Sequence, residues 1–287
     1  MSIASIKTVA VLGAGTMGNG IAHVFARAGY SVILRDVDQN FLERALSTIG
    51  MNLDREVKKG QLPESEKPAV FSRIKTVIDM AAIAAADFAV EAVPEKLEIK
   101  RAVLSEADKI LRPEVILASN TSSISMTTLA ALTSRPDRFV GMHFMNPVPV
   151  MALVEVIRAL QTSDAAFNLT LELSEKLGKT PVAVNDAPGF VSNRVLMPLI
   201  NEAAYCVMEG VATPEAVDAV MKLGMNHPMG PLELADFIGL DVCVDILHVL
   251  QQGLGDPKYR ACPLLKKYVA AGWLGRKSSR GFYRYQK

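Results

Sequence analysis

The sequence offers little that would build a disulfide framework or a metal site. Cysteine occurs only three times in 287 residues, at Cys206, Cys243 and Cys262, with no C-x-x-C pair and no histidine at ligand spacing. An odd, scattered set of this kind predicts neither disulfides nor zinc. We therefore expect free thiols and no bound metal.

The sequence also lacks an excess of either charge and any long apolar run. Its 31 basic and 30 acidic residues nearly cancel, so no overall field draws the chain to nucleic acid or to an anionic membrane. No apolar stretch approaches the roughly 20 residues of a membrane span, and the N-terminal residues lack the apolar core of a secretory signal. We expect a cytoplasmic protein that binds neither nucleic acid nor membrane.

What the sequence does have is enough apolar residues for about two domains, since half of it is hydrophobic. Strand and helix patterns alternate over residues 8–118, which predicts a Rossmann-type, mostly parallel sheet. Two strands over 139–157 are joined by a short Pro-rich connection, which favours antiparallel pairing. Beyond Pro188 only helical patterns remain. We expect an α/β domain over 1–187, followed by an all-helical domain over 188–287.

The clearest motif is a G-x-G-x-x-G that follows directly on an apolar strand. It comprises Gly13, Ala14, Gly15, Thr16, Met17 and Gly18. Glycines at these positions permit a tight turn and let a pyrophosphate approach the backbone at a helix start. An amphipathic helix follows, and then a second strand that ends at Asp36. The complete order of elements predicts a dinucleotide site, with an FAD site or an empty fold as the alternatives.

Asp36 bears on which dinucleotide binds. An acid at the tip of the second strand accepts hydrogen bonds from a ribose 2′-hydroxyl and repels the 2′-phosphate of NADP. Arg35 is an argument for NADP, because a guanidinium could pair with that phosphate. We expect NAD as the cofactor.

Hydride transfer at a carbonyl needs a group that exchanges a proton near neutral pH, and histidine is suited to this. Of the four histidines, His23 lies within a predicted helix, His227 in a Gly/Pro loop and His248 in a late amphipathic helix. His143 instead lies where a strand of the nucleotide domain ends, the edge at which doubly wound sheets bind ligands. It is the candidate acid/base.

Glu155 is the candidate partner of His143. It lies between apolar residues in an apparently buried strand, where a carboxylate needs a partner to offset its desolvation. If the two strands pair antiparallel, the carboxylate comes close enough to orient the imidazole and to stabilise its protonated form. A structural salt bridge between Glu155 and an arginine is the alternative.

Five blocks of the chain resemble the short-chain L-3-hydroxyacyl-CoA dehydrogenase family. They are SNTSSIS at 119–125, GMHFMNPVPVMALVEVI at 141–157, DAPGFVSNRVL at 186–196, MGPLELADFIGLD at 229–241 and GFYRY at 281–285. The resemblance covers essentially the whole chain, in register and without large gaps. It implies reversible NAD-dependent oxidation of an (S)-3-hydroxyacyl-CoA, with 3-hydroxybutyryl-CoA as the expected substrate, to the 3-oxoacyl-CoA.

The resemblance also assigns roles to individual residues. His143 matches the acid/base, Glu155 the acid that orients it, and Ser122 and Asn193 the polar residues around the reacting oxygen and the thioester. The implied neighbours of NAD, besides the glycine turn and Asp36, are Glu95, Lys100, Asn120, Ser122, Asn146 and Lys277. Lys59 and Asn52 match positions that touch the adenosine phosphates of CoA. Because Asn193 belongs to the second domain, the implied site lies between the domains.

Ser279 departs from the family pattern, which has glycine there, so the loop around Lys277 is expected to differ in shape.

One alternative function is an NAD-dependent dehydrogenase of a related hydroxy acid without CoA. Another is a non-catalytic NADH-binding protein, although a binding module would not need the four catalytic candidates. A dehydrogenase with a catalytic lysine is disfavoured, because Asn193 and Arg194 open the second domain with no lysine nearby. The helical domain has more apolar helix faces than about 100 residues bury alone, which predicts a homodimer.

Overall fold

The computed structural model describes residues 2–286, and the chain divides into two compact units. The first unit ends at Ala187 and the second begins at Pro188. Each unit has a hydrophobic core of its own, built on a sheet in the first and on helices in the second.

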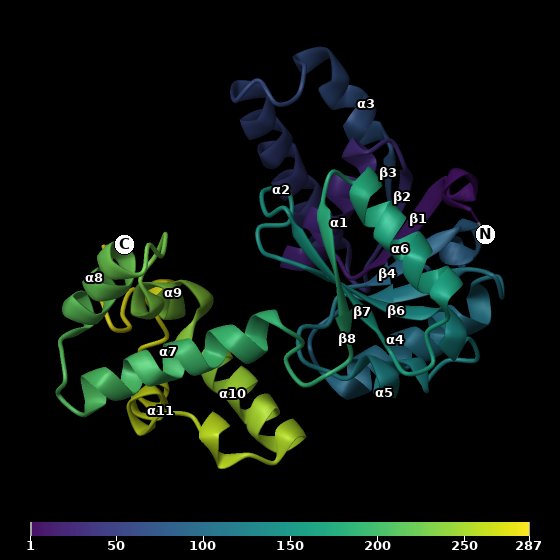
Figure 1. The fold of residues 1–287 in the computed structure, drawn as a ribbon. Coiled ribbons are helices and arrows are strands. Elements are labelled where there is room, and N and C mark those ends of the chain that lie inside the picture. Colours follow the sequence, from purple (N-terminus) through teal and green to yellow (C-terminus); the bar gives the residue numbers. More distant parts are fainter. Residues whose placement is uncertain (1, 287) are drawn as a thin grey trace. The chain divides into compact units, whose positions relative to one another are not determined.

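An eight-stranded sheet forms the centre of the first unit, in the order β3-β2-β1-β4-β5-β6-β7-β8 (Figure 1). The strands are β1 (Thr8–Leu12), β2 (Ser31–Arg35), β3 (Ile74–Val77), β4 (Phe88–Glu91), β5 (Ile116–Ser119), β6 (Phe139–Phe144), β7 (Leu153–Arg158) and β8 (Thr180–Asn185). All pairs from β3 to β6 are parallel, β7 is antiparallel to β6, and β8 is parallel to β7. The predicted mostly parallel sheet is confirmed. Its reversal at β7 follows because the connection over residues 145–152 is too short for a crossover helix.

Helices cover both faces of this sheet (Figure 1). They are α1 (Thr16–Arg27), α2 (Gln39–Lys58), α3 (Lys67–Ser72), α4 (Leu97–Ile110), α5 (Met126–Ala130) and α6 (Asp164–Lys176). Side chains of α1, α2, α3 and α6 share one core cluster with the strands, which includes Ile21, Leu42 and Leu173. Helices α4 and α5 lie on the opposite side of the strands. Helix α1 ends before Gly29, whose φ of +97° favours glycine and stops the helix.

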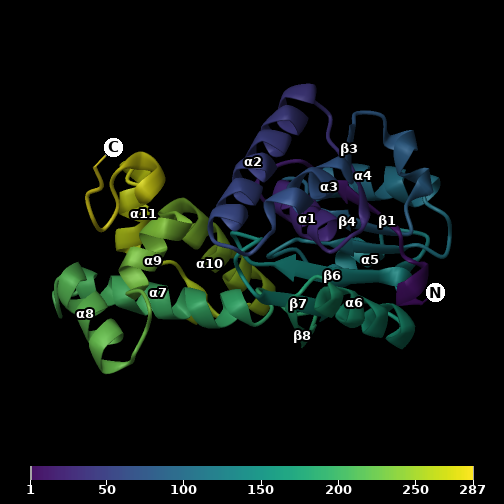
Figure 2. The same ribbon diagram turned by 90° about the horizontal axis from the view of Figure 1, so that it is seen from above.

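The second unit is helical, as predicted (Figure 2). Its helices are α7 (Ser192–Met208), α8 (Pro214–Gly224), α9 (Pro231–Ile238), α10 (Leu240–Leu254) and α11 (Pro263–Ala270). They bury a core that includes Met197, Leu232, Leu247 and Leu265. Among the residues described, no helix has both the length and the apolar character needed to cross a membrane.

Two buried carboxylates fasten the C-terminal tail of the second unit. Asp236 accepts the backbone N–H groups of Phe282 and Tyr283, at 3.0 and 2.9 Å. Asp218 accepts the Tyr283 hydroxyl at 2.7 Å, and burial together with this carboxylate raises the pKa of Tyr283. A Cβ on Gly281 would lie 1.9 Å from an Asp236 oxygen, so only glycine fits there. The blocks MGPLELADFIGLD and GFYRY are thus joined by hydrogen bonds that hold this unit together.

Candidate functional site

The glycine turn follows β1 and starts α1, and its three glycines have different roles. Gly13 has a φ of +104°, and a Cβ there would lie 2.7 Å from the carbonyl oxygen of Ala92. A Cβ on Gly18 would lie 1.8 Å from the Gly13 oxygen, so both glycines are required by packing. Gly15 has an ordinary φ of −65°, and a Cβ there would meet no atom within 4 Å. The open space beside Gly15, at a helix start without a side-chain cap, fits a pyrophosphate.

Asp36 follows β2 and lies beside this turn. Its carboxylate accepts the backbone N–H of Ala14 at 2.6 Å and that of Val37 at 2.7 Å. Arg35 is engaged elsewhere, since its Nε donates to the carbonyl oxygen of Ile78 at 3.1 Å. The acid, rather than the guanidinium, is therefore tied to the phosphate turn, which is the arrangement that favours NAD over NADP.

The remaining predicted positions in the first unit follow the ends of neighbouring strands. Glu95 comes after β4, Asn120 and Ser122 come after β5, and His143 and Asn146 stand at the end of β6. In the sheet the strands β2, β1, β4, β5 and β6 are consecutive neighbours, and neighbouring strands lie about 4.8 Å apart. The candidate residues thus form a row along the carboxyl edge of the parallel sheet, where ligands of such folds bind.

Glu95 and the buried Lys100 belong to one ion-pair network beneath the loop after β5. Nζ of Lys100 lies 2.7 Å from Glu91, 3.2 Å from Glu95 and 3.2 Å from the carbonyl oxygen of Val93. An ammonium has three N–H donors, so each has a protein acceptor here. Lys100 is only 1% exposed and Glu91 is fully buried. Lys100 therefore serves as the positively charged partner of Glu91 and Glu95.

Glu95 also holds the loop that carries Ser122. One carboxylate oxygen accepts the backbone N–H groups of Ser122 and Ser123, each at 3.0 Å, and the hydroxyl groups of Thr121 and Ser123. Burial acts to raise the pKa of Glu95, but the Lys100 ammonium and the hydroxyl donors outweigh it and hold that pKa below its usual range. Asn120, next in the row, accepts the backbone N–H of Phe144 at 2.9 Å.

His143 and Glu155 occupy directly paired positions of β6 and β7. Nδ1 of His143 lies 2.8 Å from Oε2 of Glu155, so the antiparallel pairing brings the two together as predicted. The side chains are 9% and 3% exposed. Placing Nδ1 toward the carboxylate directs the other ring nitrogen, Nε2, away from it. An imidazole held in this way by a buried acid can take up and return a proton at Nε2.

The other histidines have different surroundings. His23 is completely buried in α1, and its Nε2 lies 3.1 Å from Glu56 of α2, so its role is in packing. His227 is half-buried between α8 and α9, and His248 is exposed on α10. Of the four, His143 is the one at the carboxyl edge of the sheet.

Four predicted residues lie outside this row. Asn52 and Lys59 belong to α2 and its C-terminal cap; Asn52 accepts a hydrogen bond from Arg55 at 3.2 Å, and Lys59 is exposed. Asn193 lies in the first turn of α7, and Lys277 forms an ion pair of 2.6 Å with Asp241, so both belong to the second unit.

In the loop around Lys277, the backbone of Ser279 has the conformation expected of the glycine that the family pattern has there. Ser279 has a φ of +60° and a ψ of 11°, the left-handed conformation that favours glycine. The Ser279 N–H donates to the carbonyl oxygen of Arg276 at 3.1 Å, which closes the turn. Serine thus stands in a conformation that glycine would adopt without strain.

Sequence reasoning missed Glu91, Ser119 and Asp186. Glu91 accepts the Ser119 hydroxyl at 2.5 Å in addition to Lys100, and Asp186 binds the end of the loop after β5. One signal could have revealed the buried network, because Lys100 stands at helical spacing among the buried residues Leu104 and Ala107 of α4. A charge on the buried face of a helix requires an internal partner.

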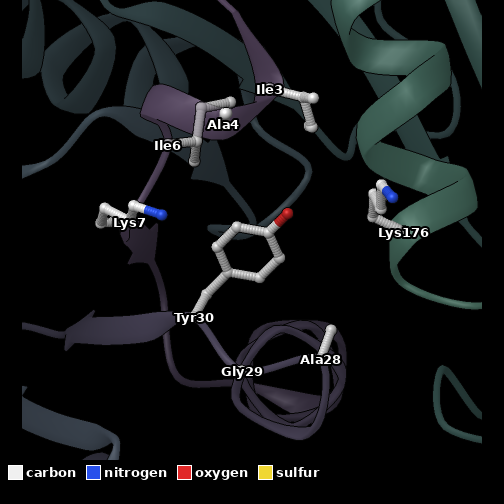
Figure 3. A pocket seen from close by; sticks show the side chains of 8 residues that line it. All are labelled: Ile3, Ala4, Ile6, Lys7, Ala28, Gly29, Tyr30 and Lys176. Atoms are coloured by element: carbon white, nitrogen blue, oxygen red, sulfur yellow. The ribbon is translucent and has the colours of Figure 1, made fainter.

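A separate pocket of about 360 Å³ lies near the amino-terminal ends of β1 and β2 (Figure 3). Lys7, which precedes β1, and Tyr30, which precedes β2, line it together with Ile3, Ile6 and Lys176. Lys7 and Tyr30 stand at the amino ends of β1 and β2. The pocket is therefore distinct from the row of candidate residues at the carboxyl ends.

Both units of the chain match models of known protein domains. The chain matches the model of the 3-hydroxyacyl-CoA dehydrogenase NAD-binding domain over residues 8–187 and that of the 3-hydroxyacyl-CoA dehydrogenase C-terminal domain over 189–285. It is 55% identical to 3-hydroxybutyryl-CoA dehydrogenase of Bradyrhizobium diazoefficiens, over 99% of this chain and 97% of that protein.

Solved structures show the same likeness. The crystal structure of (S)-3-hydroxybutyryl-CoA dehydrogenase from Ralstonia eutropha matches with a TM-score of 0.96 and 50% identity, covering 99% of this chain and all of the other. A diketoreductase that acts on dicarbonyl compounds matches with a TM-score of 0.85 and 30% identity, covering 98% of this chain and 99% of the other.

Proposed function

The chain belongs to the 3-hydroxyacyl-CoA dehydrogenase family, and on that premise we propose that it catalyses the reversible NAD-dependent oxidation of (S)-3-hydroxyacyl-CoA to 3-oxoacyl-CoA. The observation that carries the proposal is the pairing of His143 with Glu155, 2.8 Å apart, on the sheet edge that begins at the glycine turn. Relatives that match over the whole chain support the same reaction.

In this proposal His143 is the acid/base. In the oxidation its Nε2 removes the proton of the C3 hydroxyl, and in the reduction it returns that proton. Glu155, held at Nδ1, stabilises the protonated imidazole and fixes its orientation, because a buried carboxylate beside the ring favours the charged form. NAD, when bound, supplies the acceptor for the hydride from C3.

We propose that the residues of the sheet edge hold the dinucleotide. The turn from Gly13 to Gly18 would bind the pyrophosphate and Asp36 the ribose of the adenosine. The remaining proposed neighbours are Glu95, Asn120, Ser122, Asn146 and Lys277, while Lys100 would support Glu95. The open space beside Gly15 and the carboxylate at the end of β2 support this assignment.

For the substrate, we propose a CoA thioester with a short acyl chain. Ser122 and Asn193 would bind near the reacting oxygen and the thioester, while Lys59 and Asn52 would bind the adenosine phosphates. An exposed cation at a helix end is suited to a 3′-phosphate. The relative named for 3-hydroxybutyryl-CoA supports a four-carbon chain. The likeness to diketoreductase keeps a small dicarbonyl compound without CoA as the second candidate.

We propose further that two copies of the chain pair through the helical unit. Apolar side chains stand exposed on its first helices, among them Leu223 at 88% and Val195 at 66%, and an interface would cover them. A dimeric mass at micromolar concentration is expected, and a monomeric mass would contradict this.

We also propose a cytoplasmic location. The free thiols of Cys206, Cys243 and Cys262 support it, because a reducing compartment keeps thiols in that state.

The experiment that tests the function is a comparison of initial rates. Purified protein should oxidise NADH in the presence of 3-oxoacyl-CoA substrates of C4 to C16, with the highest kcat/KM at C4 and with NADPH much less effective. Absence of NADH oxidation with every CoA thioester, together with reduction of a free dicarbonyl compound, would favour the second candidate.

A further inference from the structure

Two carboxylates hold the loop between β5 and α5, residues 120–125, one at its middle and one at its end. At its first half Glu95 accepts the backbone N–H groups of Ser122 and Ser123. Ser122 lies in the middle of this six-residue loop, so its position depends on both attachments. The proposed mechanism assigns no role to the second attachment.

Asp186 forms this second attachment. Its carboxylate accepts the Ser125 hydroxyl at 2.7 Å, the Met126 N–H at 3.1 Å and the Thr127 N–H at 2.8 Å. Asp186 and Ser125 are 61 positions apart in the sequence, so the contact is a tertiary one. Ser125 in turn caps α5 by accepting the N–H of Thr128 at 3.2 Å.

The backbone of Asp186 is fixed as well. Its N–H donates to the carbonyl oxygen of Arg158 at 3.0 Å and so continues the pairing of β8 with β7. The chain leaves the first unit directly afterwards, at Ala187. One carboxylate therefore ties the point of exit from the sheet domain to the loop that carries Ser122.

We propose that Asp186 is a positioning residue of the reaction, which acts by fixing the loop that presents Ser122. A carboxylate that accepts three donors holds them in one arrangement, and hydrogen bonds to a charged acceptor are the stronger kind. A short loop fixed at its middle and at its end has little conformational freedom between the two points. The inference rests on the proposed function, because that function gives Ser122 its role at the substrate.

The test uses Asp186→Asn and Asp186→Ala in the full-length protein, with Asp87→Asn as the matched control. Asp87 likewise accepts two backbone N–H groups, from Lys7 and Thr8 at 2.9 Å each, and a side-chain donor, from Arg112 at 2.7 Å. It precedes β4 and so lies at the amino edge of the sheet, away from the candidate site. Both substitutions remove the same kind of contact, but only one touches the loop.

The first readout is amide hydrogen exchange in the cofactor-free protein. Asp186→Asn should speed exchange over residues 122–127, including Ser122 and Ser123, whose N–H groups do not contact Asp186. Asp87→Asn should leave exchange over 122–127 unchanged. If the alanine variant does not fold, Ser125→Ala replaces it, since that change removes one donor and keeps the carboxylate; a smaller effect in the same direction is expected.

The second readout is steady-state kinetics with acetoacetyl-CoA and NADH. Asp186→Asn should lower kcat/KM for the thioester about 10- to 100-fold, because small displacements of a positioning group have effects of this size. The Kd of NADH should change by a smaller factor than kcat/KM, since the glycine turn and Asp36 are untouched. Exchange at Ser122 and Ser123 equal to the wild type, or kcat/KM no lower than in Asp87→Asn, would overturn the inference. Failure of the wild-type protein to act on any CoA thioester would instead overturn the proposed function.

Discussion

Nδ1 of His143 and a carboxylate oxygen of Glu155 lie 2.8 Å apart, at directly paired positions of the antiparallel strands β6 and β7. Both residues are buried. A buried carboxylate is costly unless a partner offsets its desolvation, and the imidazole is that partner. The contact with His143 is the pairing that the two strands predict.

Replacing Glu155 by Gln should lower kcat about 10²- to 10⁴-fold, because the amide retains the shape but no longer stabilises the protonated imidazole. The Kd of NADH should stay within about threefold of the wild-type value, since Glu155 is remote from the glycine turn. Acetoacetyl-CoA reduction and NADH fluorescence measure the two quantities. Glu172→Gln, at an exposed position of α6, is the control. A kcat for Glu155→Gln within twofold of the control would refute the orienting role.

Substitutions in the glycine turn should separate binding from folding. Gly15→Val should leave the melting temperature nearly unchanged, because the side chain would extend into open space, yet it should weaken NADH binding more than about tenfold by filling the pyrophosphate site. Gly18→Ala should instead destabilise the fold, because its Cβ would overlap the Gly13 carbonyl. Calorimetry and NADH titration distinguish the two. Tight NADH binding by a folded Gly15→Val protein would contradict the assignment of the turn.

Lys59 tests whether the substrate carries CoA. Lys59→Glu should raise the KM for acetoacetyl-CoA about tenfold, because a carboxylate repels the 3′-phosphate that the lysine would bind. The KM for acetoacetyl-N-acetylcysteamine, which lacks the nucleotide, should not change. The neighbouring exposed Lys58→Glu serves as the control for charge alone. Equal KM values for wild type and Lys59→Glu would favour the substrate without CoA.

Asp108 and Arg135 give a pH-dependent prediction. Asp108 accepts Nε of Arg135 at 2.6 Å and the N–H of Ser134 at 2.6 Å. Burial acts to raise the pKa of Asp108, but these donors outweigh it and hold that pKa below its usual range. Because the folded-state pKa is the lower one, the stabilisation is present above the ordinary value near 4 and is lost as the pH falls through the folded value.

Asp108→Asn should therefore lower the melting temperature by about 2–6 °C at pH 7 and by progressively less as the pH falls below about 4, because the wild type loses the same contribution over that range. Thermal melts across this pH range provide the measurement. Asp164→Asn, whose side chain is 87% exposed, should change the melting temperature by no more than about 1 °C. A difference for Asp108→Asn that does not narrow on acidification would contradict the assigned cause.

The sequence alone was sufficient for features that depend on local pattern. The glycine turn, the strand that ends at Asp36 and the pairing of His143 with Glu155 all follow from motifs or from two strands joined by a short connection. Contacts between distant segments were not predictable in this way. Asp186 binds a loop 61 positions earlier, and nothing in its sequence neighbourhood indicates that partner.

Short elements and buried charges account for the rest of what sequence analysis missed. Helix α5 has only five residues, too few for a helical period to be recognised. Lys100 lies at helical spacing from the buried residues of α4, but its burial against Glu91 depends on how that helix packs on the sheet. The conformation of Ser279 could not be inferred either, because an αL residue that is not glycine is held by the surrounding turn.

The central claim, that His143 exchanges the substrate proton, is tested most directly by the turnover of His143→Gln. The protein should bind NADH with a Kd close to the wild-type value, while kcat for acetoacetyl-CoA reduction falls at least about 10²-fold at every pH between 5 and 9. A variant that binds NADH normally and retains more than half of the wild-type kcat would contradict the account.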